Sequence, residues 1–167
     1  MEQVKTAVIG IGNMGTAHAV CLAEGRIEGA VLTAVCDIRP ERLADFHTRY
    51  PKVACYSSED ELLASGAAQA AVIAVPHPLH SEMAIKALNA GWHVLVEKPV
   101  DVRLSRARAL CETAKKSGRV FALMLNQRTN PLFRKAREIV RGGLDCDQLV
   151  SNAALLRFRR MARDVGG

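Results

Sequence analysis

Short apolar runs of strand length alternate with longer segments of helical periodicity along most of the chain. The apolar runs predict strands at 6–9, 30–36, 52–56, 70–75, 92–96 and 120–125. The intervening segments predict helices at 14–25, from 40, through 62–63, at 79–90, at 104–117 and at about 131–140. In the first of these helices, one stripe predicts the buried face: Met14, Ala17, Cys21 and Leu22. The alternation is typical of βαβ units, so we predict an α/β fold with a doubly wound parallel sheet of the Rossmann type.

The composition fits one globular domain with a fragment of a second. The chain has 167 residues, of which 49% are hydrophobic and 24% charged, and these values are typical of folded protein. No apolar run approaches the roughly 20 residues of a membrane-spanning helix. The first predicted strand begins too early to leave room for a signal peptide. We therefore expect a cytoplasmic protein without a membrane partner.

Two compositional features point to other functions, and neither is well supported. The net charge is +6, and residues 98–141 carry twelve Lys and Arg against three acidic residues, as a nucleic-acid-binding face does. Aromatic residues for base stacking make up only 4% of the chain, so we expect a solvated helix surface and no nucleic acid. The five cysteines lie far apart without a CxxC pair, which favours small buried thiols over a zinc site or disulfides.

A glycine-rich turn joins the first predicted strand to the first predicted helix. It consists of Gly10, Ile11, Gly12, Asn13, Met14 and Gly15. This GxGxxG pattern between a strand and a helix predicts a dinucleotide-binding turn. Gly10 permits the tight turn, Gly12 opens the backbone to a pyrophosphate, and Gly15 lets the helix pack close to the sheet. The free amides and the dipole at the helix start then favour phosphate binding.

Asp37 ends the second predicted strand, 22 residues after Gly15. A carboxylate in this position accepts hydrogen bonds from the adenosine ribose and repels a 2′-phosphate, so Asp37 favours NAD over NADP. Arg39 lies two residues further on and can pair with a 2′-phosphate, which keeps NADP possible. The alternative without a cofactor is a bare glycine turn with Asp37 as a helix cap.

Two further groups of residues, Pro76 to His80 and Glu97-Lys98-Pro99, follow predicted strands. Open α/β sheets bind ligands at the carboxyl ends of their strands. With these groups the sequence resembles the Gfo/Idh/MocA oxidoreductase family from residue 3 to about 144. The residues that carry the resemblance are Gly10 to Gly15 with His18, then Pro76, His80, Ala84 and Leu88, then Gly91 to Val100, and Asn126, Gln127, Arg128 and Pro131.

The resemblance implies an enzyme that interconverts hydroxyls and ketones on sugars, cyclitols and related small molecules with NAD(P). It implies that Lys98 exchanges a proton with the substrate hydroxyl while hydride moves to or from the nicotinamide. A half-desolvated lysine at a strand end is suited to this role. Glu97 would orient Lys98, and Pro99 would fix the bend through a cis bond. The alternative is that Lys98 binds a phosphate or a surface carboxylate.

The resemblance also suggests which other side chains surround the cofactor. Besides the glycine turn, they are Asp37, Arg39, Pro76, His80, Glu97, Asn126 and Arg128. We expect His80 to be a helix cap or a packing residue on the nicotinamide side rather than a catalyst. Asn126 and Arg128 contact nicotinamide or substrate, or else form the polar hinge at which a second domain begins.

The match to the family ends near Gly143. Family members continue into a mostly antiparallel substrate domain, so we divide the chain into a dinucleotide-binding domain at 1–125 and the start of an α+β domain at 126–167. Residues 149–167 resemble a basic helix instead of the expected strand. We favour a gene interrupted or frame-shifted near Leu144 over a genuine short variant. In either case we expect a chain that binds the dinucleotide and self-associates as a homo-oligomer. We also expect it to lack appreciable dehydrogenase activity, which leaves a binding module without turnover as the alternative function.

Overall fold

The computed structural model describes residues 3–142 of the chain. Its centre is a six-stranded sheet in the order β3-β2-β1-β4-β5-β6, and all neighbouring strands are parallel. The strands are β1 Val4–Ile9, β2 Ala30–Cys36, β3 Ala54–Tyr56, β4 Ala70–Ile73, β5 His93–Glu97 and β6 Phe121–Met124. This order is that of the doubly wound Rossmann sheet, which confirms the predicted fold class.

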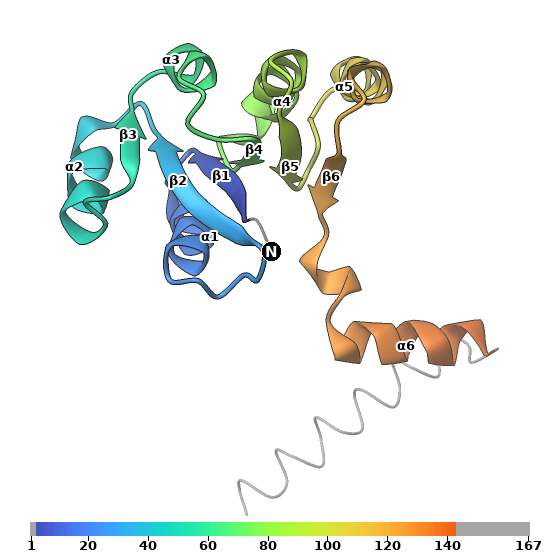
Figure 1. Cartoon of the computed structure of the whole chain (residues 1–167). Coiled ribbons are helices and arrows are strands. Elements are labelled where there is room, and N and C mark those ends of the chain that lie inside the picture. The colour runs from blue at the N-terminus through green and yellow to red at the C-terminus, as the bar shows by residue number, and fades with distance from the viewer. Residues whose placement is uncertain (1–2, 143–167) are drawn as a thin grey trace, which may run out of the picture. The chain divides into compact units, whose positions relative to one another are not determined.

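Helices cover both faces of the sheet (Figure 1). On one face lie α1 Asn13–Ala23 and α2 Pro40–Arg49; on the other lie α3 Glu59–Ala64, α4 His80–Asn89 and α5 Leu104–Ser117. The first layer packs around Val8, Val35 and Phe46, and the second around Leu62, Leu88 and Leu110. Each face therefore has its own hydrophobic core.

The buried face of α1 differs from the predicted stripe. Met14 is 51% exposed, and the buried residues are Gly15, Ala19 and Leu22. The helix consists mostly of small or apolar residues, so its pattern does not select one face. The close approach at Gly15 selects the buried face, because a Cβ there would lie 1.7 Å from the Gly10 carbonyl oxygen.

The prediction of buried thiols holds for one cysteine. Cys36 is buried, Cys21 and Cys55 are half-buried, and Cys111 is exposed, while Cys146 lies outside the described residues. Burial, followed by the nearby carboxylates of Glu59 and Asp37, raises the pKa of the Cys36 thiol to about 12. The Cys36 side chain therefore stays protonated and unreactive near neutral pH.

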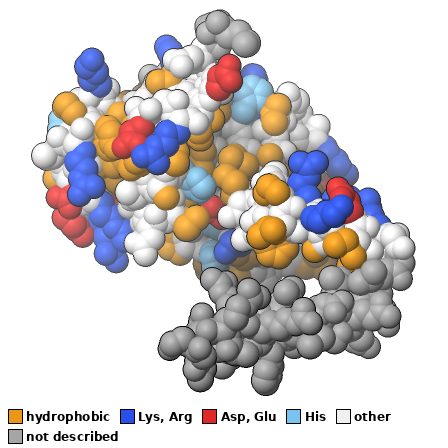
Figure 2. All heavy atoms as spheres, turned by 90° about the horizontal axis from the view of Figure 1, so that it is seen from below, with side chains coloured by type: hydrophobic (Ala, Val, Ile, Leu, Met, Phe, Trp, Pro, Cys, Tyr) orange, Lys and Arg blue, Asp and Glu red, His pale blue; other side chains and the backbone are white. Residues whose placement is uncertain are grey.

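Within the first of two compact units, Met1–Met124, strands β4 to β6 leave a hollow beside α1. Its volume is about 300 Å³, and apolar side chains such as Leu22, Leu95 and Met124 line much of it. Figure 2 views the chain from the side of α1 and shows hydrophobic side chains exposed there. The helices of this face therefore cover only part of the sheet.

The second unit, Leu125–Gly167, is described as far as residue 142. A 3-10 helix, Asn126–Arg128, precedes α6 Pro131–Arg141. Asn130 caps α6, because its side-chain oxygen accepts the Leu132 N–H at 2.9 Å. The predicted basic helix near the end of the chain lies outside the described residues. None of the helices that the structure describes is both long and apolar enough to span a bilayer.

Candidate active site

The glycine turn lies where the order of the strands reverses. β1 and β4 are neighbours in the sheet although two strands separate them along the chain. The segments after them therefore diverge toward opposite faces, and such a crevice is where open α/β sheets bind ligands. The Ala74 N–H, just after β4, donates to the Ile9 carbonyl at 2.9 Å and keeps the two segments together.

The start of α1 is open to an anion. Gly12 is the N-cap of α1, and no side chain caps the helix there. Among the described residues other than the two chain neighbours of Gly12, one atom, Arg42 Nη1 at 3.7 Å, lies within 4 Å of the position that a Gly12 Cβ would occupy. The uncapped amides and the space above Gly12 fit the phosphates of a dinucleotide.

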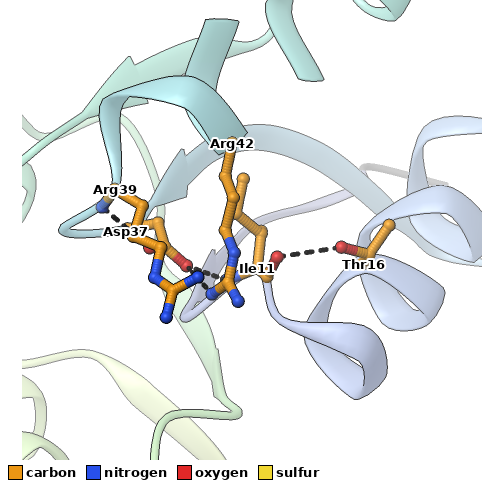
Figure 3. Close-up of polar contacts among 5 residues, drawn as sticks. All are labelled: Ile11, Thr16, Asp37, Arg39 and Arg42. Carbon is orange, nitrogen blue, oxygen red and sulfur yellow. Dashed lines mark hydrogen bonds and ion pairs between the residues drawn. The ribbon is translucent and has the colours of Figure 1, made fainter. Parts of the chain in front are cut away.

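Asp37 connects this turn to the start of α2 (Figure 3). Its side chain is buried, and one oxygen accepts the Ile11 N–H at 2.9 Å. The other oxygen accepts the N–H of Arg39, the N-cap of α2, also at 2.9 Å. Asp37 is therefore not the helix cap of the alternative interpretation, because the N-cap of α2 is Arg39 and no side chain caps that helix. It lies at the glycine turn, as ribose binding requires.

Arg42 joins the site although the sequence analysis did not include it. Its Nη1 lies 3.2 Å from the Asp37 carboxylate. Figure 3 shows the Arg39 and Arg42 side chains extending to the same side of Asp37. A helix that starts at Pro40 places residue 42 in its first turn, and that spacing could have pointed to Arg42.

His80 is the first residue of α4 and is only 1% exposed. Its Nδ1 lies 2.6 Å from the Pro99 carbonyl oxygen, and its Nε2 lies 2.8 Å from the Val75 carbonyl oxygen. The predicted cap role is wrong, because the N-cap of α4 is Leu79 and no side chain caps the helix. The His80 ring is a buried packing residue that contacts two loops.

The Glu97-Lys98-Pro99 segment begins with the last residue of β5, at the same edge of the sheet, and the Lys98–Pro99 bond is cis. Glu97 is buried, and its Oε2 accepts the Lys98 N–H at 3.1 Å. Its Oε1 lies 2.8 Å from Nε2 of His18, which comes from α1. The Lys98 side chain is exposed rather than half-desolvated, and Glu97 binds the lysine backbone. His18, which belongs to the residues that carry the resemblance but was assigned no role, is a further member of the site.

The remaining predicted residues are Pro76, Asn126 and Arg128. Pro76 is exposed and precedes the 3-10 helix His77–Leu79. Asn126 and Arg128 belong to the second unit, where one hollow of about 480 Å³ is lined by Gln127, Arg128, Phe133, Arg134, Arg137 and Arg141. Their contacts with a cofactor or substrate stay a prediction. Within residues 3–142, no group of three or more His, Cys, Asp or Glu side chains is placed to hold a metal ion.

Comparison with known proteins agrees with this geometry. The profile of the Gfo/Idh/MocA oxidoreductases, described as an oxidoreductase family with an NAD-binding Rossmann fold, matches residues 4–125. The chain belongs to this family. NAD is accordingly the cofactor of its Rossmann domain.

Relatives within the Gfo/Idh/MocA family include two inositol dehydrogenases. The myo-inositol 2-dehydrogenase of Thermotoga maritima is 30% identical over 140 residues, which make up 84% of this chain and 41% of that protein. The scyllo-inositol 2-dehydrogenase (NAD(+)) of Bacillus subtilis is 30% identical over 143 residues, 85% of this chain and 41% of that protein. The chain therefore spans about two fifths of the length of these curated relatives.

A solved structure of the same kind is also similar. Scyllo-inositol dehydrogenase from Lactobacillus casei, with bound NAD(H) and scyllo-inositol, superimposes with a TM-score of 0.78 at 25% identity. The superposition covers 85% of this chain and 42% of that protein. The similarity thus extends over the Rossmann domain and ends well before the relative does.

Proposed function

We propose that this chain is the cofactor-binding part of an NAD-dependent dehydrogenase that oxidises a secondary alcohol of a sugar or cyclitol. The observation that carries the proposal is the uncapped start of α1 at Gly12 beside Asp37, with Lys98 at the same edge of the sheet. The inositol dehydrogenases among the relatives support this class of substrate.

The turn from Gly10 to Gly15 would hold the pyrophosphate through its amides. Asp37 would accept hydrogen bonds from the ribose hydroxyls through Oδ1, which accepts one N–H, that of Arg39, whereas Oδ2 already accepts from both the Ile11 N–H and Arg42 Nη1. Arg39 and Arg42 would offset the charge of Asp37 and admit NADP as a weaker ligand. Pro76 lies after β4 and Glu97 is the last residue of β5, on the side where the nicotinamide would bind.

When bound, NAD supplies the acceptor for the hydride that leaves the carbinol carbon. Lys98, as a neutral amine, would take the hydroxyl proton while the C=O bond forms, and its ammonium would return the proton in the reverse direction. The substrate must be held within about 3–3.5 Å of the reacting groups. We assign that task to a second domain whose start is residues 126–167, with Asn126 and Arg128 contacting nicotinamide or substrate.

Turnover measurements test this proposal. A polypeptide of these 167 residues should bind NAD(H) but not oxidise members of a panel of sugars and cyclitols. A longer polypeptide that carries a complete second domain should oxidise at least one of them, and Lys98→Ala should lower its kcat by about 10²–10⁴-fold because a general base is lost.

Lys115→Ala, at an exposed position of α5, serves as the control and should leave kcat within about twofold. Turnover by the 167-residue polypeptide would contradict the assignment of substrate positioning to a complete second domain. An unchanged kcat for Lys98→Ala in the longer form would contradict the role of Lys98, and no turnover by that form would identify a binding module.

A further inference from the structure

Lys98 lies between two residues that are each bound by a histidine from a different helix. On its N-terminal side, the Glu97 carboxylate contacts His18 of α1 at 2.8 Å. On its C-terminal side, the Pro99 carbonyl contacts His80 of α4 at 2.6 Å. The backbone around the exposed lysine is therefore held from both layers of helices.

The His80 ring bridges two loops at the site. Its partners, Val75 O and Pro99 O, belong to the segments that follow β4 and β5. Carbonyl oxygens only accept hydrogen bonds, so the His80 ring can contribute to this bridge only as a donor. A carbonyl that is left without a donor at a buried site destabilises the structure around it. The bridge thus fixes the distance between the two loops.

The His18 contact ties Lys98 to the helix that starts at the phosphate turn. Glu97 is 7% exposed and uses one carboxylate oxygen for His18 and the other for the Lys98 N–H, at 3.1 Å. His18 lies in the second turn of α1, whose first residue follows Gly12. Removing His18 would leave a buried carboxylate with one contact fewer and free it to release the Lys98 backbone.

We propose that His18 and His80 are positioning residues for Lys98. They fix the backbone on either side of an exposed side chain whose placement depends on that backbone. The catalytic consequence rests on the proposed function, but the positioning itself is measurable on the 167-residue polypeptide without cofactor or turnover.

Two substitutions of similar size separate the two contacts of the His80 ring. Asn places its amide nitrogen near the position of Nδ1 and keeps a donor for Pro99, whereas Gln reaches the position of Nε2 and keeps a donor for Val75. By hydrogen exchange, we expect the amides of Lys98, Val100 and Asp101 to exchange at least about tenfold faster in His80→Gln and within about threefold of the parent in His80→Asn. The exposed neighbour His77 provides the control, and His77→Asn should leave these rates unchanged.

Competitive acetylation with acetic anhydride reports on the Lys98 amine itself, with Lys115 as the internal reference. In His80→Gln and His18→Leu, the rate of Lys98 should change at least about threefold and approach that of Lys115, while His80→Asn restores it. His18 is only partly buried. If the variants of the fully buried His80 fail to fold, exchange and labelling of His18→Leu therefore test the positioning role.

Equal exchange and labelling in His80→Gln and His80→Asn, or a His18→Leu variant identical to the parent, would overturn the proposal. A titration of the parent with NADH runs beside these measurements. Failure of the parent to bind NADH would contradict the proposed function and leave the positioning result standing.

Discussion

Three glycines of the phosphate turn are required for three different physical reasons. Gly10 has φ +87°, and a Cβ there would lie 2.8 Å from Val75 Cγ1. Gly15 admits no side chain at all, because its Cβ would meet the Gly10 carbonyl at 1.7 Å. Gly12 has neither a positive φ nor a close neighbour. Its lack of a side chain therefore benefits only a ligand. A substitution at Gly12 should affect ligand binding without affecting folding.

Asp37→Ser should shift cofactor preference toward NADP. The substitution removes the carboxylate that repels a 2′-phosphate and frees the Arg42 guanidinium, which lies 3.2 Å from it. We expect the ratio of the dissociation constants, NAD over NADP, to rise at least about tenfold in calorimetric titrations.

Arg39→Leu and Arg42→Leu on the Asp37→Ser background are the matched controls. Arg42→Leu should cancel more of the shift, because Arg42 Nη1 lies next to both Asp37 and Gly12. An unchanged ratio in Asp37→Ser would mean that Asp37 acts only through its hydrogen bonds to the Ile11 and Arg39 amides.

The sequence indicated those members of the site whose signal is local. The glycine turn and Asp37 follow from residue types at fixed spacing after a strand. His18 and Arg42 were missed because each is defined by a contact between elements, and His18 is 79 residues from its partner Glu97. Of the two roles expected for His80, a helix cap or a packing residue, the cap was wrong for the same reason, since the Pro99 carbonyl contacts the ring from 19 residues away.

At the scale of elements, the contact between α3 and α4 contains a buried carboxylate, that of Glu59. Glu59, the first residue of α3, is 8% exposed, and neither of its oxygens has a hydrogen-bond partner among the described residues. Lys86 of α4 lies 3.6 Å away and lowers the Glu59 pKa, but burial outweighs it and raises that pKa to about 7. The N-cap of α3 is Ser58, whose side chain accepts the Glu61 N–H at 3.5 Å.

Glu59→Gln should stabilise the protein at pH 8 and change little at pH 5. A carboxyl whose folded pKa lies above its unfolded value of 4.5 favours the fold below that value, and the benefit is lost as the pH rises through 7. Gln resembles the protonated form, so the free energy of unfolding at pH 8 should rise by about 1–3 kcal/mol. Thermal or urea unfolding at the two pH values measures the difference.

Asp60→Asn is the control for the prediction at Glu59. Asp60 contacts the same lysine at 3.3 Å, but its side chain is 78% exposed, so the change should stay within about 0.5 kcal/mol at either pH. A Glu59→Gln variant that is less stable than the parent at pH 8 would show that the ion pair with Lys86 outweighs the burial of the carboxylate.

At the scale of the whole molecule, strand and helix alternation was enough to predict a doubly wound sheet. Element boundaries moved by a few residues, as at β4, which was predicted to reach residue 75 and ends at Ile73. The hollow beside α1 at strands β4 to β6 could not be located from sequence, because its position depends on which helices pack on which face of the sheet. Its role in the predicted self-association stays a prediction.

Calorimetric titration of NADH into the 167-residue polypeptide and its Gly12→Val variant tests most directly whether the start of α1 holds the cofactor. Valine fits the extended backbone of Gly12, at φ −71° and ψ −163°, so the unfolding temperature should stay within about 3 °C of the parent. The valine side chain would occupy the space above the first-turn amides, so affinity should fall by more than about tenfold. Equal affinity of parent and Gly12→Val would contradict the assignment of the phosphates to this turn.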